Sequence, residues 1–136
     1  MSITRVLVVD DDLRMRELIA TVLGAAGFEV CGEAGDGETA VRSARALQPD
    51  VVTMDVEMPI LDGLSATRRI VALNLAPVVI VSGSRAGSES DAAVAAGASC
   101  HLPKTSVAWA LPLAVRFTAE LARERRELHT RTRRAS

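Results

Sequence analysis

Short runs of aliphatic and β-branched residues alternate with stretches of helical period along the chain, and this alternation limits the fold more than any other feature. The apolar runs are continuous, which is typical of strands that are buried on both faces of a parallel sheet. Between them, apolar residues recur every three or four positions, as on one face of an amphipathic helix. We expect strands at residues 6–9, 28–33, 51–54, 78–81 and 99–102.

Five strands, each followed by a helix, predict a protein of the α/β class with a doubly wound parallel sheet covered on both faces. A Rossmann-like half domain is the main alternative within this class. It would carry a G-x-G-x-x-G turn after its first strand, where this chain has Asp10, Asp11 and Asp12. The acidic run therefore argues against a dinucleotide ligand.

Composition indicates one reduced, water-soluble domain. The chain has 136 residues and an aromatic content of 2%, so its core must be aliphatic. Cys31 and Cys100 lie far apart without metal-ligand spacing, so we expect free thiols in a cytoplasmic protein. No apolar run approaches the roughly 20 residues of a membrane span, and acidic residues come too early for a signal peptide. We therefore expect no membrane partner.

Charge is distributed unevenly and suggests a boundary near residue 122. Residues 1–122 carry ten basic and fifteen acidic side chains, a net charge of −5. Residues 123–136 carry six arginines and two glutamates, a net charge of +4. We expect a domain at 1–122 and a basic helix extension or tail at 123–136. The tail has no aromatic residue to stack on bases, and its glutamates would repel phosphate, so the composition does not favour a nucleic-acid partner.

Four of the expected strands end in residues that carry chemistry. The first runs into Asp10 and Asp11, the third into Asp55, the fourth into Ser82 and the fifth into Lys104. The carboxyl ends of parallel strands meet at one edge of the sheet, where such folds bind ligands. We therefore expect these side chains to lie close together.

These residue types suit a phosphoryl group. Crowded carboxylates raise one another's pKa unless a cation neutralises them, and carboxylate oxygens with room for water suit Mg²⁺. A metal ion, a hydroxyl and an ammonium could together bind phosphoryl oxygens, leaving one carboxylate as the nucleophile that forms an acyl phosphate. Asp55 is the best candidate because it stands alone at its strand end. Lys104 is the only lysine of the chain, and a compact ammonium follows an oxygen more freely than a planar guanidinium does.

Four motifs carry a resemblance to a known family: VLVVDDD, PDVVTMDVEMPILDG, VVIVSGS and AGASCHLPK, in this order. With them, residues 3 to about 120 resemble a response regulator receiver domain of bacterial two-component signalling. The resemblance implies a flavodoxin-like fold, with a five-stranded parallel sheet of order 2-1-3-4-5 and five helices. DVEMP and VSGS look most like receivers of chemotaxis methylesterases, whereas DGLSATRRI looks more like receivers attached to helix-turn-helix domains.

The resemblance also implies a role for each site residue. Asp55 would be the phosphoacceptor and Lys104 would hold a phosphoryl oxygen. His101 stands where receivers commonly place an aromatic switch residue. The remaining implied roles are direct Mg²⁺ binding by Asp11, water-mediated binding or orientation by Asp10, metal binding by the backbone carbonyl of Glu57, and phosphoryl binding by Ser82.

A receiver would accept its phosphoryl group from a sensor histidine kinase or a phosphotransfer protein and signal to an effector that the sequence does not identify. Its fourth and fifth helices with the fifth strand would form a switchable surface, and a homodimer through this surface is one expectation. The alternative is an enzyme, a Mg²⁺-dependent phosphatase or phosphotransferase with an aspartyl-phosphate intermediate. Glu57 could serve it as the acid, but the chain has no segment for a substrate-enclosing cap. A receiver that has lost its phosphorylation is a third reading.

The last helix is expected to begin near Thr105 or Ser106. Pro112 should kink it or mark its true beginning, and Trp109 is expected on its inner face. A 3-4 spacing relates six apolar residues of this segment: Val107, Ala110, Ala114, Phe117, Leu121 and Leu128.

Overall fold

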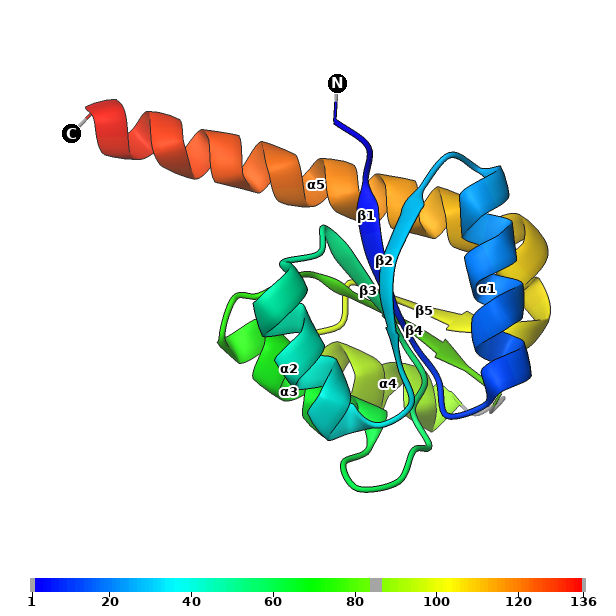
Figure 1. Ribbon diagram of the computed structural model, residues 1–136. Helices are drawn as coiled ribbons and strands as arrows, with labels where there is room; N and C mark the ends of the chain where they lie inside the picture. Colours follow the sequence, from blue (N-terminus) through cyan, green and yellow to red (C-terminus); the bar gives the residue numbers. More distant parts are fainter. Residues whose placement is uncertain (1, 84–86, 136) are drawn as a thin grey trace.

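The computed structural model describes residues 2–83 and 87–135, and of residues 87–89 the backbone alone. Strands and helices alternate as the hydrophobic pattern predicts, with boundaries within a few residues of those expected (Figure 1). The elements are β1 Arg5–Val9, α1 Leu13–Ala25, β2 Glu29–Ala34, α2 Gly37–Leu47, β3 Val51–Met54, α3 Gly63–Ala72, β4 Val78–Ser82, α4 Gly87–Ala95, β5 Cys100–Pro103, a 3-10 turn Lys104–Ser106 and α5 Val107–Ala135.

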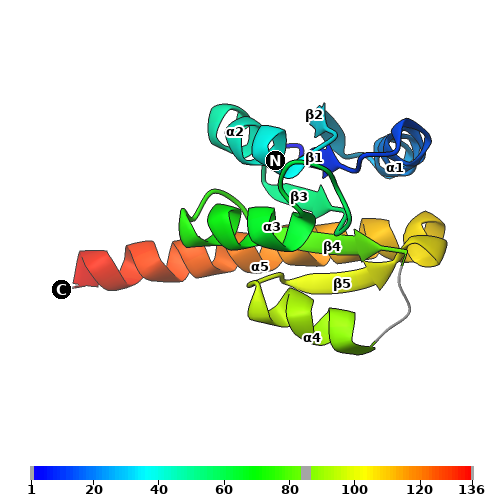
Figure 2. The same ribbon diagram turned by 90° about the horizontal axis from the view of Figure 1, so that it is seen from below.

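The sheet is parallel and has the order β2-β1-β3-β4-β5, which confirms the predicted flavodoxin-like topology. Its two faces bury separate aliphatic cores. On one face Ile70 and Ala93, from α3 and α4, pack with α2 against the sheet, and on the other Leu23 and Val115, from α1 and α5, do so. Figure 2 shows α4 and the long helix α5 on opposite sides of β5. The central strands β1, β3 and β4 are therefore covered on both sides, which is why their sequences are largely apolar, whereas the edge strands β2 and β5 are only partly buried and include polar residues.

Aspartates begin three of the helices that follow the strands. Asp12, Asp36 and Asp62 each accept a hydrogen bond from a backbone N–H two or three residues later, at 2.8 to 2.9 Å. Such caps satisfy N–H groups that have no partner within the helix. They fix the turns at which the chain leaves the carboxyl edge of the sheet.

The last helix differs from the prediction in two respects. It continues through Pro112, so of the two expectations for this proline the one that it marks the beginning of the helix is wrong. The Trp109 side chain is 72% exposed, so its expected place on the inner face is wrong. The core instead receives Leu111 and Val115, which occupy a second apolar stripe of the same helix. Two stripes at helical spacing fit the sequence equally well, and packing on α1 and the sheet decides between them.

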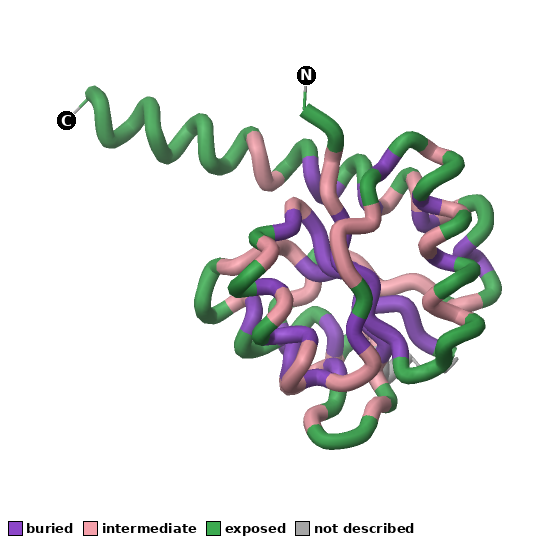
Figure 3. Tube along the Cα trace, in the orientation of Figure 1, coloured by how far each residue is buried: buried purple, intermediate pink, exposed green. Residues whose placement is uncertain are grey.

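The carboxyl-terminal turns of α5 extend beyond the sheet (Figure 1). Residues 124–135 are exposed along their whole length (Figure 3). Near the point where the helix leaves the domain, the Arg123 guanidinium donates a hydrogen bond to the Thr4 hydroxyl oxygen at 2.8 Å. In the described part of the chain, no helix combines the length and the apolar character that a membrane crossing requires. Cys31 and Cys100 are free thiols, as expected.

Candidate functional site

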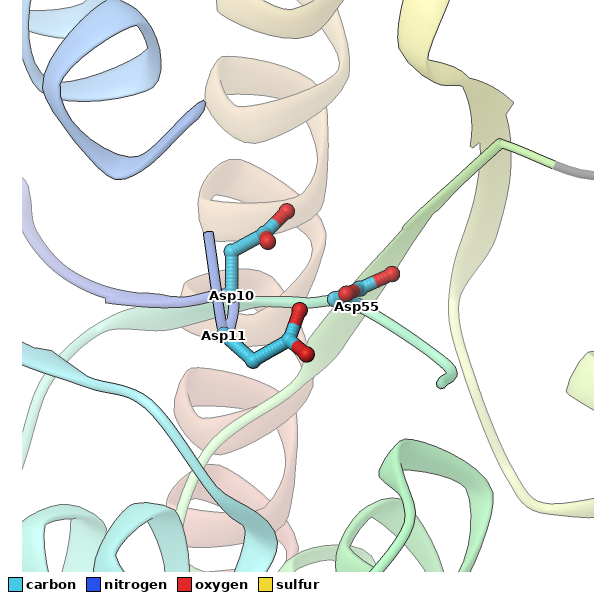
Figure 4. Close-up of side chains that lie close together, drawn as sticks. All are labelled: Asp10, Asp11 and Asp55. Atoms are coloured by element: carbon cyan, nitrogen blue, oxygen red, sulfur yellow. The ribbon is translucent and has the colours of Figure 1, made fainter. Parts of the chain in front are cut away.

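Three carboxylates gather at the carboxyl edge of the sheet. Asp10 and Asp11 follow β1 directly, and Asp55 follows β3. One oxygen from each side chain lies within 4.8 Å of the others, and Figure 4 shows the three groups side by side. Asp10 and Asp55 are buried, whereas Asp11 is exposed. The carboxylate cluster predicted from the strand ends is therefore present.

Lys104 is the cation of this cluster. It follows β5 directly, and its Nζ lies 3.0 Å from Asp10 Oδ2 and 3.4 Å from Asp55 Oδ1. Burial alone would lower the pKa of Lys104, but its interactions with Asp10 and Asp55 outweigh that effect and raise it. The ammonium is therefore charged and bridges the two buried carboxylates.

Backbone hydrogen bonds hold the acidic residues in place. The Asp55 N–H donates to the Val9 carbonyl oxygen at 2.9 Å, which ties the end of β3 to the end of β1. The Asp12 N–H donates to Asp10 Oδ1 at 2.9 Å. The Val56 N–H donates to Asp55 Oδ1 at the same distance of 2.9 Å. Each buried carboxylate is thus oriented by an N–H group of its own strand-to-loop turn.

A pocket of about 410 Å³ opens above the cluster. Ser82, the last residue of β4, is buried at its wall, while Glu57 is exposed in the loop after Asp55. All the predicted strand-end residues except Asp10 line it directly. The lining residues are Asp11, Asp55, Glu57, Ser82, Gly83 and Lys104.

The cluster has more negative charge than Lys104 neutralises. Burial and, after it, the neighbouring Asp10 carboxylate raise the pKa of Asp55 from 3.8 to about 7, against the opposing effect of Lys104. Asp10 Oδ2 is buried and, although it is paired in charge with Lys104, it accepts no well-aligned hydrogen bond. A hard cation with oxygen ligands would relieve both conditions. Asp10, Asp11 and Asp55 therefore fit Mg²⁺.

His101 lies in β5, opposite Ile80 of β4. Its Nδ1 is 2.8 Å from the Ser90 hydroxyl oxygen on α4, whereas its Nε2 is buried without a hydrogen-bond partner. His101, three residues before Lys104, thus links the fifth strand to the fourth helix through a side-chain hydrogen bond. It does not line the pocket above Asp55.

Sequence reasoning missed three residues of this region. Gly63 has no room for a side chain, because a Cβ there would collide with the Asp55 carbonyl oxygen, and its N–H donates to the Val56 carbonyl oxygen at 2.8 Å. The Asp-Gly pair at the start of α3 could have indicated this close approach. Gly83 and Ser90 carry no such signal, since only the folded structure brings them to the pocket and to His101.

The sheet order and the acidic pocket define a flavodoxin-like α/β domain with its site at the carboxyl edge. Comparison with known proteins gives the family. The sequence model described as "Response regulator receiver domain" matches residues 6–116. The chain therefore belongs to the response regulator receiver domain family of two-component systems, and the phosphatase alternative is not favoured.

Individual relatives agree with this family. Protein-glutamate methylesterase/protein-glutamine glutaminase 4 of Geobacter metallireducens is 44% identical over 104 residues, which cover 74% of this chain and 30% of that protein. The transcriptional regulatory protein PdtaR of Mycobacterium tuberculosis is 39% identical over 100 residues, covering 74% and 49% of the two chains. The response regulator domain of Thermotoga maritima CheB has a TM-score of 0.81 at 31% identity, covering 88% of this chain and 98% of that one. The chain spans half or less of the two curated relatives and matches only their receiver part.

The raised pKa of Asp55 predicts a stability that falls as pH rises when no divalent ion is present. Between about pH 4 and pH 7 the unfolded chain has lost this proton while the folded protein still holds it, so folding is favoured at the acidic end of that window. Urea unfolding in EDTA at pH 5 and pH 8 measures the effect. The Asp55→Asn variant should show a flatter pH dependence, and an equal slope in both proteins would contradict the assignment.

Proposed function

We propose that Asp55 is the phosphoacceptor of this receiver and that its modification requires Mg²⁺. The observation that carries the proposal is the bridging of buried Asp10 and Asp55 by Lys104, inside a pocket that Ser82 also lines. The site thus offers one buried carboxylate oxygen as nucleophile, with a cation and a hydroxyl beside it to bind the incoming oxygens.

In the transfer step, an Asp55 carboxylate oxygen attacks the phosphorus atom of the donor. A new bond forms between this oxygen and phosphorus, and the bond to the donor atom breaks, leaving its electron pair on the donor. For a phosphohistidine donor that atom is an imidazole nitrogen. Lys104 would exchange its contact with Asp55 for one with a phosphoryl oxygen, and the Ser82 hydroxyl would donate a hydrogen bond to another phosphoryl oxygen.

Asp11 and Asp55 would hold the Mg²⁺ ion through their carboxylates, with the backbone carbonyl of Glu57 as a further ligand and Asp10 acting through water or by orienting the site. When bound, the ion would supply positive charge that favours the ionised form of Asp55 and offsets the charge of the phosphoryl oxygens. Asp55 has to be ionised to act as a nucleophile. Because its pKa is raised to about 7, a large fraction of this carboxyl group is protonated near neutral pH when no metal ion is bound.

The phosphoryl donor we propose is a sensor histidine kinase or a phosphotransfer protein in the cytoplasm. We place any enzymatic output outside this chain, which corresponds to the receiver part of its methylesterase relatives. In this proposal the receiver and its effector are separate molecules or separate segments. We also propose that the receiver ends near residue 122 and that residues 123–136 are a basic helix extension or tail.

Incubation with Mg²⁺ and acetyl phosphate, followed by intact-mass measurement, tests the proposal. We expect one phosphoryl group per chain with Mg²⁺ and none in EDTA. The enzyme alternative predicts instead a steady release of phosphate from added phosphate esters, with no stable label. Absence of labelling in Mg²⁺ would support a receiver that has lost its phosphorylation.

We propose that His101 transmits the modification to α4. The hydrogen bond between His101 Nδ1 and the Ser90 hydroxyl joins β5 to α4. The buried Nε2 of His101 has no hydrogen-bond partner, and a rearrangement of this region could give it one. We expect the imidazole NMR signals of His101 to shift on phosphorylation, and to shift already in the Ser90→Ala variant. His129, on the exposed part of α5, is the internal control whose signals should not move. Signals of His101 that stay unchanged by phosphorylation would contradict this role.

The surface of α4, β5 and α5 is our candidate output face. Among its large apolar side chains, Leu113 is 69% exposed and Val94 is 73% exposed. A second copy of the chain could cover them, so we propose a phosphorylation-dependent homodimer. Light scattering should then give a larger mass after modification, and an unchanged mass would argue against regulated dimerisation.

A further inference from the structure

A groove lies at the amino ends of β4 and β5, at the opposite edge of the sheet from Asp55. It consists of two adjoining hollows of about 520 and 250 Å³. Both are bounded by residues just before these strands and by α5 where the helix leaves the domain. The shared lining residues are Pro77, Gly97, Ser99, Ala122 and Arg125.

One wall of this groove is apolar and open to solvent. Phe117 and Leu121 line the larger hollow from α5 and remain 64% and 39% exposed. Ala98 and Ala114 continue the same wall, and Leu75 lines the smaller hollow. Apolar side chains that face a hollow lose water-exposed area when a partner side chain enters it, which favours docking.

Two arginines stand at the mouth of the groove. Arg125 lines both hollows and Arg126 lines the smaller one. Both side chains are exposed, and in the described part of the chain neither makes an ion pair. They belong to the segment 123–136, whose net charge is +4. The groove therefore offers guanidinium groups that are available to a carboxylate.

We propose that this groove binds an acidic, amphipathic peptide segment of a partner protein. Carboxylates of the segment pair with Arg125 and Arg126, while its apolar side chains pack on Phe117 and Leu121. A polypeptide fits better than a nucleic acid because Phe117 is the one aromatic side chain among the residues that line the two hollows, whereas single-stranded nucleic acids need several aromatic platforms.

This site is separate from the phosphoacceptor site. The residues before β4 and β5 lie a full strand length from Ser82, which ends β4, and from Lys104, which follows β5. The groove is formed in the unmodified protein. Peptide binding should therefore occur without Mg²⁺ or a phosphodonor, and it does not depend on the proposed function.

Fluorescence anisotropy with a short fluorescein-labelled peptide of alternating glutamate and leucine tests the proposal. We expect saturable binding by the unmodified protein in EDTA. The double variant Arg125→Ser/Arg126→Ser should bind about ten-fold more weakly or worse, since two charge-assisted hydrogen bonds are lost. Phe117→Ser should also weaken binding, and a peptide with serine in place of leucine should bind poorly to the wild type.

Arg131→Ser/Arg134→Ser is the matched control, because it removes the same charge from the exposed helix outside the groove. It should retain the affinity of the wild type within about two-fold. If the two double variants lost the same affinity for the peptide, the net charge of the helix and not the groove would explain the binding, and the proposal would be overturned. It would also be overturned by absence of saturable binding, or by tighter binding of a labelled single-stranded oligonucleotide than of the peptide. Circular dichroism confirms that each variant is folded.

Discussion

The Asp55→Asn variant is expected to lose all phosphoryl labelling by acetyl phosphate while remaining folded. An amide oxygen is a poor nucleophile and cannot form a stable acyl phosphate, so the loss should reach the detection limit of intact-mass measurement. The amide keeps an oxygen that can accept the hydrogen bond from the Val56 N–H. The substitution also removes a buried negative charge beside Asp10. At pH 8 in EDTA the variant should therefore be more stable than the wild type by about 1–3 kcal/mol.

Asp62→Asn is the matched control for this substitution. Asp62 lies in the same loop and caps α3 through Ser65, and asparagine caps a helix about as well as aspartate. Labelling of this variant should equal that of the wild type. Persistent stoichiometric labelling of Asp55→Asn would show that another residue is the acceptor, and a lower stability than the wild type at pH 8 would contradict the charge crowding inferred for the site.

Replacing Lys104 by methionine is expected to have the second largest effect. The variant keeps most of the side-chain volume but leaves the buried Asp10 and Asp55 carboxylates without their shared cation. We expect it to lose about 1–3 kcal/mol of stability at pH 8 in EDTA, less than a fully buried pair would cost because Asp55 can take up a proton. Urea unfolding measures this loss.

Lys104→Arg separates charge from geometry. It should recover most of the lost stability, because it restores a cation near Asp10, yet its planar guanidinium cannot follow a phosphoryl oxygen as a compact ammonium does. We therefore expect phosphorylated Lys104→Arg to show a smaller shift of the His101 NMR signals than the wild type. If the methionine and arginine variants lost the same stability, this would contradict a stabilising role for the positive charge at position 104.

Much of the fold and the acidic cluster could be predicted from the sequence because both follow from local pattern. Continuous apolar runs identify buried parallel strands, and residues that directly follow such strands must share one edge of the sheet. Asp55 and Lys104 are predicted in this way although they lie 49 positions apart in the sequence. The strand order itself came from the family resemblance and not from the pattern.

Features that depend on packing between elements could not be predicted. The two apolar stripes of α5 have the same spacing, so the sequence alone did not place Trp109 on the exposed side. The Ser90 side chain reaches His101 only because α4 packs beside β5 in the folded protein. The groove beside Arg125 likewise combines loops before two strands with the end of a helix, and no single segment carries its signature.

The most direct test of Asp55 as acceptor is to locate the phosphoryl group itself. Borohydride reduces an acyl phosphate to an alcohol, so peptide mapping of the labelled and reduced protein identifies the modified residue. We predict homoserine at position 55 and aspartate retained at positions 10 and 11. Homoserine at either of those positions, or a label that survives reduction on a serine or histidine, would contradict the proposed site.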